Sequence, residues 1–93
     1  MNELLQLRAL AELHLDYTPI TDVDIKTLSQ LQGLKVLDLN DTGITDAAAK
    51  ELCKLRNLRV LHITFTGITA VGVKVLTDSS PTVDVYWVPR DAE

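Results

Sequence analysis

Two histidines and an aspartate lie at a regular spacing in this chain, and their side chains are of types that can bind a metal or respond to pH. His14, Asp38 and His62 lie 24 residues apart. Imidazole nitrogens and carboxylate oxygens are ligands for divalent metals, and a carboxylate beside an imidazole favours its charged form, as in a pH-sensitive patch. The alternative is three exposed polar residues with no site between them. The strands or helices that carry the three residues decide between a metal site, a pH-sensitive patch and three unconnected side chains.

The other chemistry-bearing residues indicate no catalytic site. The single cysteine, Cys53, excludes an internal disulfide and the cysteine-based zinc motifs. Gly43, Gly67 and Gly72 do not form a phosphate-binding loop. Catalysis would also need a nucleophile, a dry pocket and oriented donors. We therefore expect the protein not to be an enzyme, and we assign no catalytic, cofactor-binding or metal-ligating residue.

The spacing of 24 extends over most of the chain. Three repeats, at residues 10–33, 34–57 and 58–81, share the pattern Leu-x-x-Leu-x-Leu-x-x-Thr-x-Ile-Thr, with Ile63 in place of one leucine. Apolar and polar residues alternate in the phrases LHL, LDL and LHI, which predicts half-buried strands. Threonine and aspartate then precede a helical pattern, as at a helix start. Each repeat is expected to be a strand followed by a helix.

This pattern resembles the leucine-rich repeat, in the class in which a full helix follows each strand. The phrases TPITD, TGITD and TGITA are similar to those of its bacterial and cysteine-containing, ribonuclease-inhibitor-like members, which often carry Cys or Asn where this chain has Thr18, Thr42 and Thr66. We expect these threonines to satisfy backbone groups where each strand turns. The resemblance implies an α/β fold, a short right-handed β–α solenoid with a parallel sheet on its concave face and helices on its convex face.

The two ends of the chain differ from the repeats, although we expect one domain over residues 1–93. Residues 1–9 correspond to the last part of a helix in an incomplete repeat. Their leucines predict a piece of a longer solenoid, self-association into a homo-oligomer through an open N-terminal end, or a frayed turn. Residues 82–93 are expected to hold a closing strand and a tail. The alternating residues of that strand are Val83, Val85 and Trp87.

In-register stacking of the repeats places three rows of side chains on the concave face. The rows are His14, Asp38, His62 and Tyr86; Asp16, Asn40 and Thr64; and Tyr17, Asp41 and Phe65. Acidic groups with aromatic rings among them are typical of protein recognition. The alternative is a solvated sheet face that binds nothing in particular.

The sequence therefore predicts a non-enzymatic protein–protein interaction module that uses its concave face. The alternatives are a structural segment of a larger leucine-rich repeat protein with its ligand site elsewhere, or a metal- or pH-responsive site at His14, Asp38 and His62. A net charge of −4 argues against nucleic acid as a partner, and the chain has no apolar run of about 18 residues for a membrane. The lone thiol and the lack of a secretory signal predict a cytoplasmic location.

Overall fold

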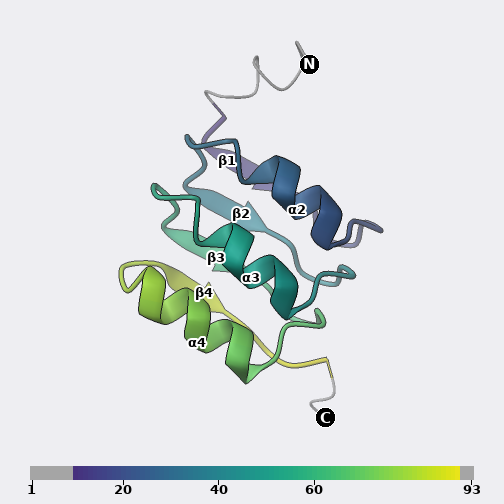
Figure 1. Ribbon diagram of the computed structural model, residues 1–93. Coiled ribbons are helices and arrows are strands. Elements are labelled where there is room, and N and C mark those ends of the chain that lie inside the picture. Colours follow the sequence, from purple (N-terminus) through teal and green to yellow (C-terminus); the bar gives the residue numbers. More distant parts are fainter. Residues whose placement is uncertain (1–9, 91–93) are drawn as a thin grey trace.

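Strands and helices alternate along the chain in the computed structural model, which describes residues 10–90. The elements are β1 (Glu12–His14), α2 (Asp22–Leu28), β2 (Val36–Asp38), α3 (Asp46–Leu52), β3 (Val60–His62), α4 (Ala70–Ser79) and β4 (Asp84–Tyr86), shown in Figure 1. The strand–helix repeat predicted from the period of 24 is confirmed. The N-terminal helix and the open end predicted for residues 1–9 lie outside the described residues.

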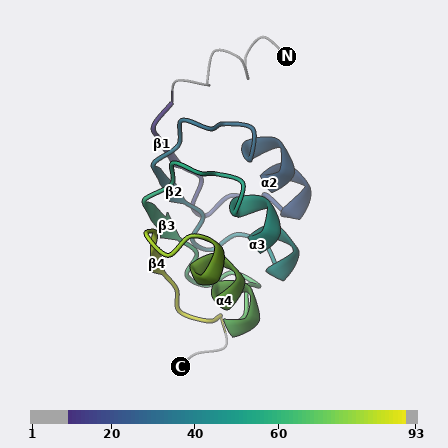
Figure 2. The same ribbon diagram turned by 60° about the vertical axis from the view of Figure 1, so that its left-hand side comes forward.

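The four strands form one parallel sheet in the order β1-β2-β3-β4. All three helices lie on the same side of the sheet, so the described part of the molecule has two layers (Figure 2). Within residues 10–90 no helix has the length and apolar character needed to cross a membrane. One face of the sheet is therefore left without a helical cover.

Alternation along the strands decides which residues occupy that uncovered face. The middle residues Leu37 and Leu61 are fully buried against the helices, and neighbours along a strand point to opposite sides. We call the uncovered side the open sheet face. It comprises Glu12, His14, Val36, Asp38, Val60, His62, Asp84 and Tyr86, whose pairing across the strands follows the period of 24.

Leucine and isoleucine fill the core between the sheet and the helices. In the second repeat Leu34, Leu37, Leu39 and Ile44 are each fully buried. Their counterparts in the first repeat are only partly buried and pack against this core. The stacked rungs of branched side chains hold the strands in register, and that register fixes the rows on the open sheet face.

A carboxylate at the start of one helix binds the next repeat. Asp22 accepts hydrogen bonds from the backbone N–H (2.7 Å) and the hydroxyl (2.6 Å) of Thr45. Asp46 accepts the same two bonds from Thr69, at 2.7 and 2.6 Å. Ala70 occupies the corresponding position in the third repeat, so this aspartate ladder ends there.

Residues 83–90 close the described part of the stack. The strand expected from Val83, Val85 and Trp87 is formed as β4, which ends one residue before Trp87. The Trp87 indole N–H donates to the carbonyl of Ile68 at 3.0 Å and so ties this segment to the third repeat.

Candidate functional site

The predicted row of His14, Asp38, His62 and Tyr86 is in register on the open sheet face. Its side chains form two pairs. The His62 ring stacks on the Tyr86 ring, with centroids 4.8 Å apart and an interplanar angle of 13°. His14 Nδ1 lies 3.6 Å from Asp38 Oδ2. The histidines therefore face different partners, and the hypothesis of one site at His14, Asp38 and His62 does not match the contacts.

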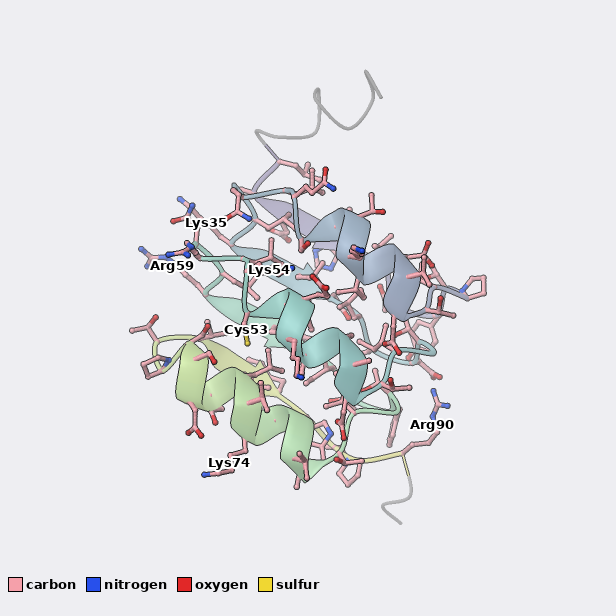
Figure 3. All side chains as sticks on the ribbon, viewed as in Figure 1. Lys35, Cys53, Lys54, Arg59, Lys74 and Arg90 are labelled. Carbon is pink, nitrogen blue, oxygen red and sulfur yellow. The ribbon has the colours of Figure 1, made fainter. Side chains whose placement is uncertain are left out.

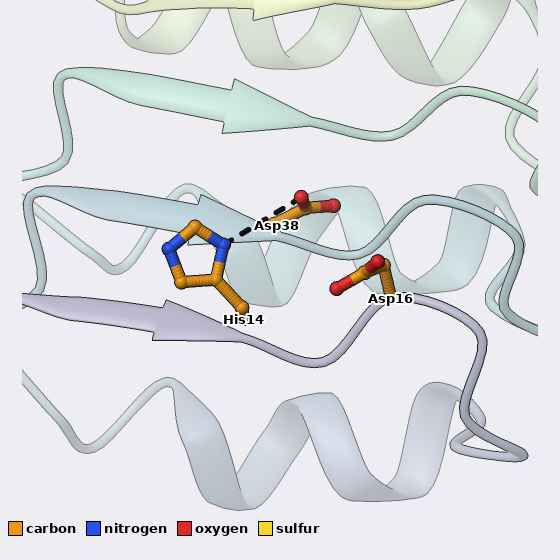
Figure 4. Close-up of side chains that lie close together, drawn as sticks. All are labelled: His14, Asp16 and Asp38. Carbon is orange, nitrogen blue, oxygen red and sulfur yellow. Dashed lines mark ion pairs between the residues drawn. The ribbon is translucent and has the colours of Figure 1, made fainter.

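His14 lies within a group of carboxylates. Its Nε2 is hydrogen-bonded to Glu12 Oε1 at 2.7 Å, and Asp16 and Asp38 lie on its other side (Figure 4). The hydrogen bond with Glu12 raises the pKa of His14 above its ordinary value. Desolvation, the next largest effect, lowers that pKa, and Asp38 raises it by less. The ring is half exposed, so this group of charges is open to ligands.

The second predicted row, Asp16, Asn40 and Thr64, follows the strands and contains both structural side chains and, within residues 10–90, an unbonded one. Asn40 Oδ1 accepts the backbone N–H of Thr64 at 2.7 Å, and the Asn40 N–H donates to Asp38 Oδ1 at 3.1 Å. Thr64 donates its hydroxyl to the Tyr86 carbonyl at 3.4 Å. Asp16 instead belongs with His14 and Asp38. Asn40 therefore positions the backbone, whereas Asp16 remains available to a ligand.

The third row, Tyr17, Asp41 and Phe65, lies in the turns after the strands, and we call it the turn row. All three residues have left-handed backbones, with φ of 60°, 59° and 58°. The N–H groups of Tyr17 and Asp41 donate to carbonyls of the next repeat, and that of Phe65 donates to Val88 in the closing segment, each at 2.9 Å. These bonds continue the strand pairing past the strand ends. The side chains of Tyr17 and Phe65 are 77% and 43% exposed. Two aromatic rings thus stand in solvent on backbones that aromatic residues seldom adopt.

One further row of the open sheet face was missed by the sequence analysis. Glu12, Val36, Val60 and Asp84 are paired across the four strands. The residues of this row precede His14, Asp38, His62 and Tyr86 by two positions. Because residues two apart in a strand lie on the same face, the alternation within each strand would have placed this row on the open sheet face. Glu12 matters most, because it bonds His14.

Several basic residues lie away from the open sheet face, whereas Arg90 lies beside the turns that follow the strands (Figure 3). Aspartates gather on the open sheet face and in the turns that lead to the helices. Lys35, Lys54 and Arg59 lie towards the opposite edge, where the chain returns from the helices to the strands (Figure 3). Lys54 is paired with Glu51 at 2.8 Å. The open sheet face and the turn row therefore present carboxylates and exposed aromatic rings, and the Arg90 guanidinium lies at the Phe65 end of the turn row.

The threonines after the strands have the structural role expected of them. The hydroxyls of Thr18, Thr42 and Thr66 donate to the carbonyls three residues earlier, at 2.6, 2.8 and 2.9 Å. Thr42 and Thr66 are buried. These hydroxyls are therefore bonded to the backbone of the turns.

Comparison with known families agrees with this geometry. A family model described as leucine rich repeat matches residues 8–77, and a search of curated proteins found no match. Domains of this family generally mediate protein–protein interaction and are typically not enzymes. With its parallel sheet, its helices on one side and its period of 24, the chain belongs to the leucine-rich repeat family.

Proposed function

We propose that the protein is a non-enzymatic module that binds a protein partner across its open sheet face and turn row. The observation that carries the proposal is the pair of exposed aromatic rings at Tyr17 and Phe65, which stand on left-handed backbones. Stability alone does not account for residues of this type at these positions.

The energetic argument rests on the backbone at the turn row. A left-handed conformation costs a residue with a Cβ on the order of 1–2 kcal/mol, and only Gly, Asn and Asp adopt it routinely. Asp41 is such a residue, but Tyr17 and Phe65 are not. Backbone strain of this kind is concentrated at functional positions, and aromatic rings supply large, rigid contact area for a partner. The two rings are therefore assigned to recognition.

The charges around these rings define the partner's chemistry. Carboxylates of Glu12, Asp16, Asp38 and Asp41 lie on the same side of the sheet or in its turns. Complementary charge speeds encounter and suppresses wrong partners, and a cationic side chain binds favourably over an aromatic face. We propose a partner surface that combines lysine or arginine with apolar side chains.

Capture of the partner by the 93-residue chain and its variants tests the proposal. Tyr17→Asn and Phe65→Asn are expected to abolish capture of a protein that the unmodified chain retains. Val23→Asn is the matched control, because Val23 is also 77% exposed but lies on helix α2. Capture that survives both aromatic substitutions, or that is lost only with Val23→Asn, contradicts use of the open sheet face and would favour a ligand site elsewhere.

Stability separates this binding role from a structural one. Tyr17→Asn is expected to raise the free energy of unfolding by about 1 kcal/mol, because asparagine tolerates the left-handed backbone. Asp41→Asn is the control and should change it little, since both residues tolerate that conformation. Urea denaturation provides the measurement. A less stable Tyr17→Asn variant would show that the ring stabilises the fold, and the argument from strain would fail.

A further inference from the structure

We propose that His14, Asp16 and Asp38 bind one divalent transition-metal ion of the zinc type on the open sheet face. The proposal does not rest on the protein-binding function, although it uses Glu12, Asp16 and Asp38, whose carboxylates were assigned above to the surface that faces the partner. It differs from the alternative of His14, Asp38 and His62 raised by the sequence, because His62 stacks on Tyr86, whereas Asp16 offers an oxygen within 4.8 Å of ligand atoms of His14 and Asp38.

The spacing of the ligand atoms suits a small cation. One nitrogen of His14 and one oxygen from each aspartate all lie within 4.8 Å of one another (Figure 4). His14 Nδ1 and Asp38 Oδ2 lie 3.6 Å apart, which is too long for a hydrogen bond. In a tetrahedral zinc site with bonds of about 2.1 Å, neighbouring ligand atoms are about 3.4 Å apart. Small side-chain movements bring the three atoms to that geometry.

The histidine is already oriented for a metal. Its Nε2 is held by Glu12 Oε1 at 2.7 Å, which leaves Nδ1 turned towards Asp38. Histidines that bind metal almost always donate their other ring N–H to a carboxylate or carbonyl, which fixes the tautomer and raises the basicity of the ligand nitrogen. Glu12 is therefore a positioning residue for His14, and this contact distinguishes the cluster from a random group of acids.

The two aspartates complete the set from different positions. The Asp38 side chain is only 18% exposed, and its Oδ1 accepts the Asn40 N–H at 3.1 Å, so its Oδ2 is directed at His14. Asp16 forms no side-chain hydrogen bond or ion pair within residues 10–90, which leaves its carboxylate free to bind. Three ligands come from two adjacent strands and from the start of the first turn.

The donor set selects the class of metal. One imidazole and two carboxylates suit zinc and its first-row neighbours, whereas calcium and magnesium require six or more oxygen ligands in most sites. Three protein ligands leave a fourth position for water or for a side chain of a partner.

Titration of the metal-free 93-residue chain with zinc chloride, followed by NMR of the imidazole nitrogens, tests the proposal. We expect the His14 Nδ1 resonance to shift and to saturate at one zinc per chain, while the His62 resonances stay in place. His14→Gln should weaken zinc binding by at least tenfold. His62→Gln is the matched control and should retain it. Glu12→Gln should weaken binding by about 10–100-fold, the usual effect of losing an orienting partner.

Several outcomes would overturn the site. These are equal loss of binding in His14→Gln and His62→Gln, no change of the His14 signals at excess zinc, and saturation by calcium but not by zinc. All the substitutions lie on an exposed face, and circular dichroism checks that each variant is folded. If a variant does not fold, the imidazole shifts of the unmodified chain decide the question alone.

Discussion

A threonine hydroxyl after each strand stabilises the turn towards the helix. In the second repeat, the Thr42 hydroxyl donates to the Leu39 carbonyl at 2.8 Å, and the side chain is 2% exposed. A buried carbonyl that loses its partner has no water to replace it, and such a loss costs about 1–3 kcal/mol. The hydroxyl group, and not only the size of the side chain, is therefore needed at this position.

Thr42→Val tests that requirement, because valine keeps the shape of threonine and removes the donor. We expect the free energy of unfolding to fall by about 1–3 kcal/mol, measured by urea denaturation. Thr64→Val is the control: its hydroxyl makes only a 3.4 Å bond in a more exposed place, so its effect should be smaller. Equal midpoints for Thr42→Val and the unmodified chain would refute the structural role.

For single residues, the sequence predicts those structural roles that follow from the position of the residue in the repeat. It does not predict contacts that depend on the side-chain rotamer. The backbone role of Thr42 follows from its place after a strand. The stacking of His62 on Tyr86, by contrast, is a choice between two neighbours in the same row, and the period of 24 treats both neighbours alike. The left-handed backbone of Tyr17 was not predictable from its residue type, because aromatic side chains disfavour it.

The aspartate ladder explains a glycine inside a helix. Gly72 is buried in α4, where a helix interior normally favours alanine over glycine by roughly 0.5–1 kcal/mol. A Cβ at this position would meet the Asp46 carboxylate and would lie 2.8 Å from Ile68 Cγ2. That carboxylate is held by the two bonds from Thr69, so it cannot move away without breaking them. Helices α3 and α4 thus approach as closely as they do only with glycine here.

Gly72→Ala is accordingly expected to lower stability, by about 1–3 kcal/mol, although alanine is the better helix former. Asp46→Ala removes the ladder bonds and should cost a similar amount. Because Asp46→Ala also removes the group that the new methyl meets, the double variant should lose less stability than the sum of the two single variants. Urea denaturation of all four proteins completes this double-mutant cycle. Additive losses would show that Gly72 and Asp46 act independently.

The elements themselves were largely predictable, since strand and helix patterns recur three times and reinforce one another. The aspartate ladder was not predictable. Aspartates at helix starts, such as Asp22 and Asp46, are already explained by the favourable field of the helix dipole. Their bonds to the next repeat depend on the distance between helices, which no local pattern gives. The change from aspartate to Ala70 in the third repeat was the one sequence signal for it.

In the whole molecule, contacts between elements join adjacent repeats: α2 packs on α3, α3 on α4, and each strand on the next. Arg90 reaches further. Its guanidinium donates to the Phe65 carbonyl at 2.8 Å and to the Thr42 carbonyl at 2.9 Å, two repeats away from β4 in the stack. Stability in such arrays is approximately a sum of repeat and interface contributions. A residue that spans two interfaces couples the closing strand to the middle of the stack.

Arg90→Met tests this coupling, because methionine keeps much of the aliphatic stem and removes the donors. The bonds are largely exposed, so we expect the closing segment to lose only about 1 kcal/mol. Trp87, the single tryptophan, reports on that segment by fluorescence, and far-ultraviolet circular dichroism reports on the helices. Their urea transitions should coincide in the unmodified chain and separate in Arg90→Met, with the fluorescence change first.

Arg56→Met is the control for this prediction, because Arg56 is exposed and forms no side-chain hydrogen bond or ion pair in the part of the chain that the structure describes. It should leave the two transitions superimposed. If Arg90→Met also unfolds in a single transition at an unchanged midpoint, the stack is held by its leucine rungs alone. If the transitions separate, the guanidinium couples the turn at Phe65 to the closing strand, and the shape of the turn row depends on both ends of that contact.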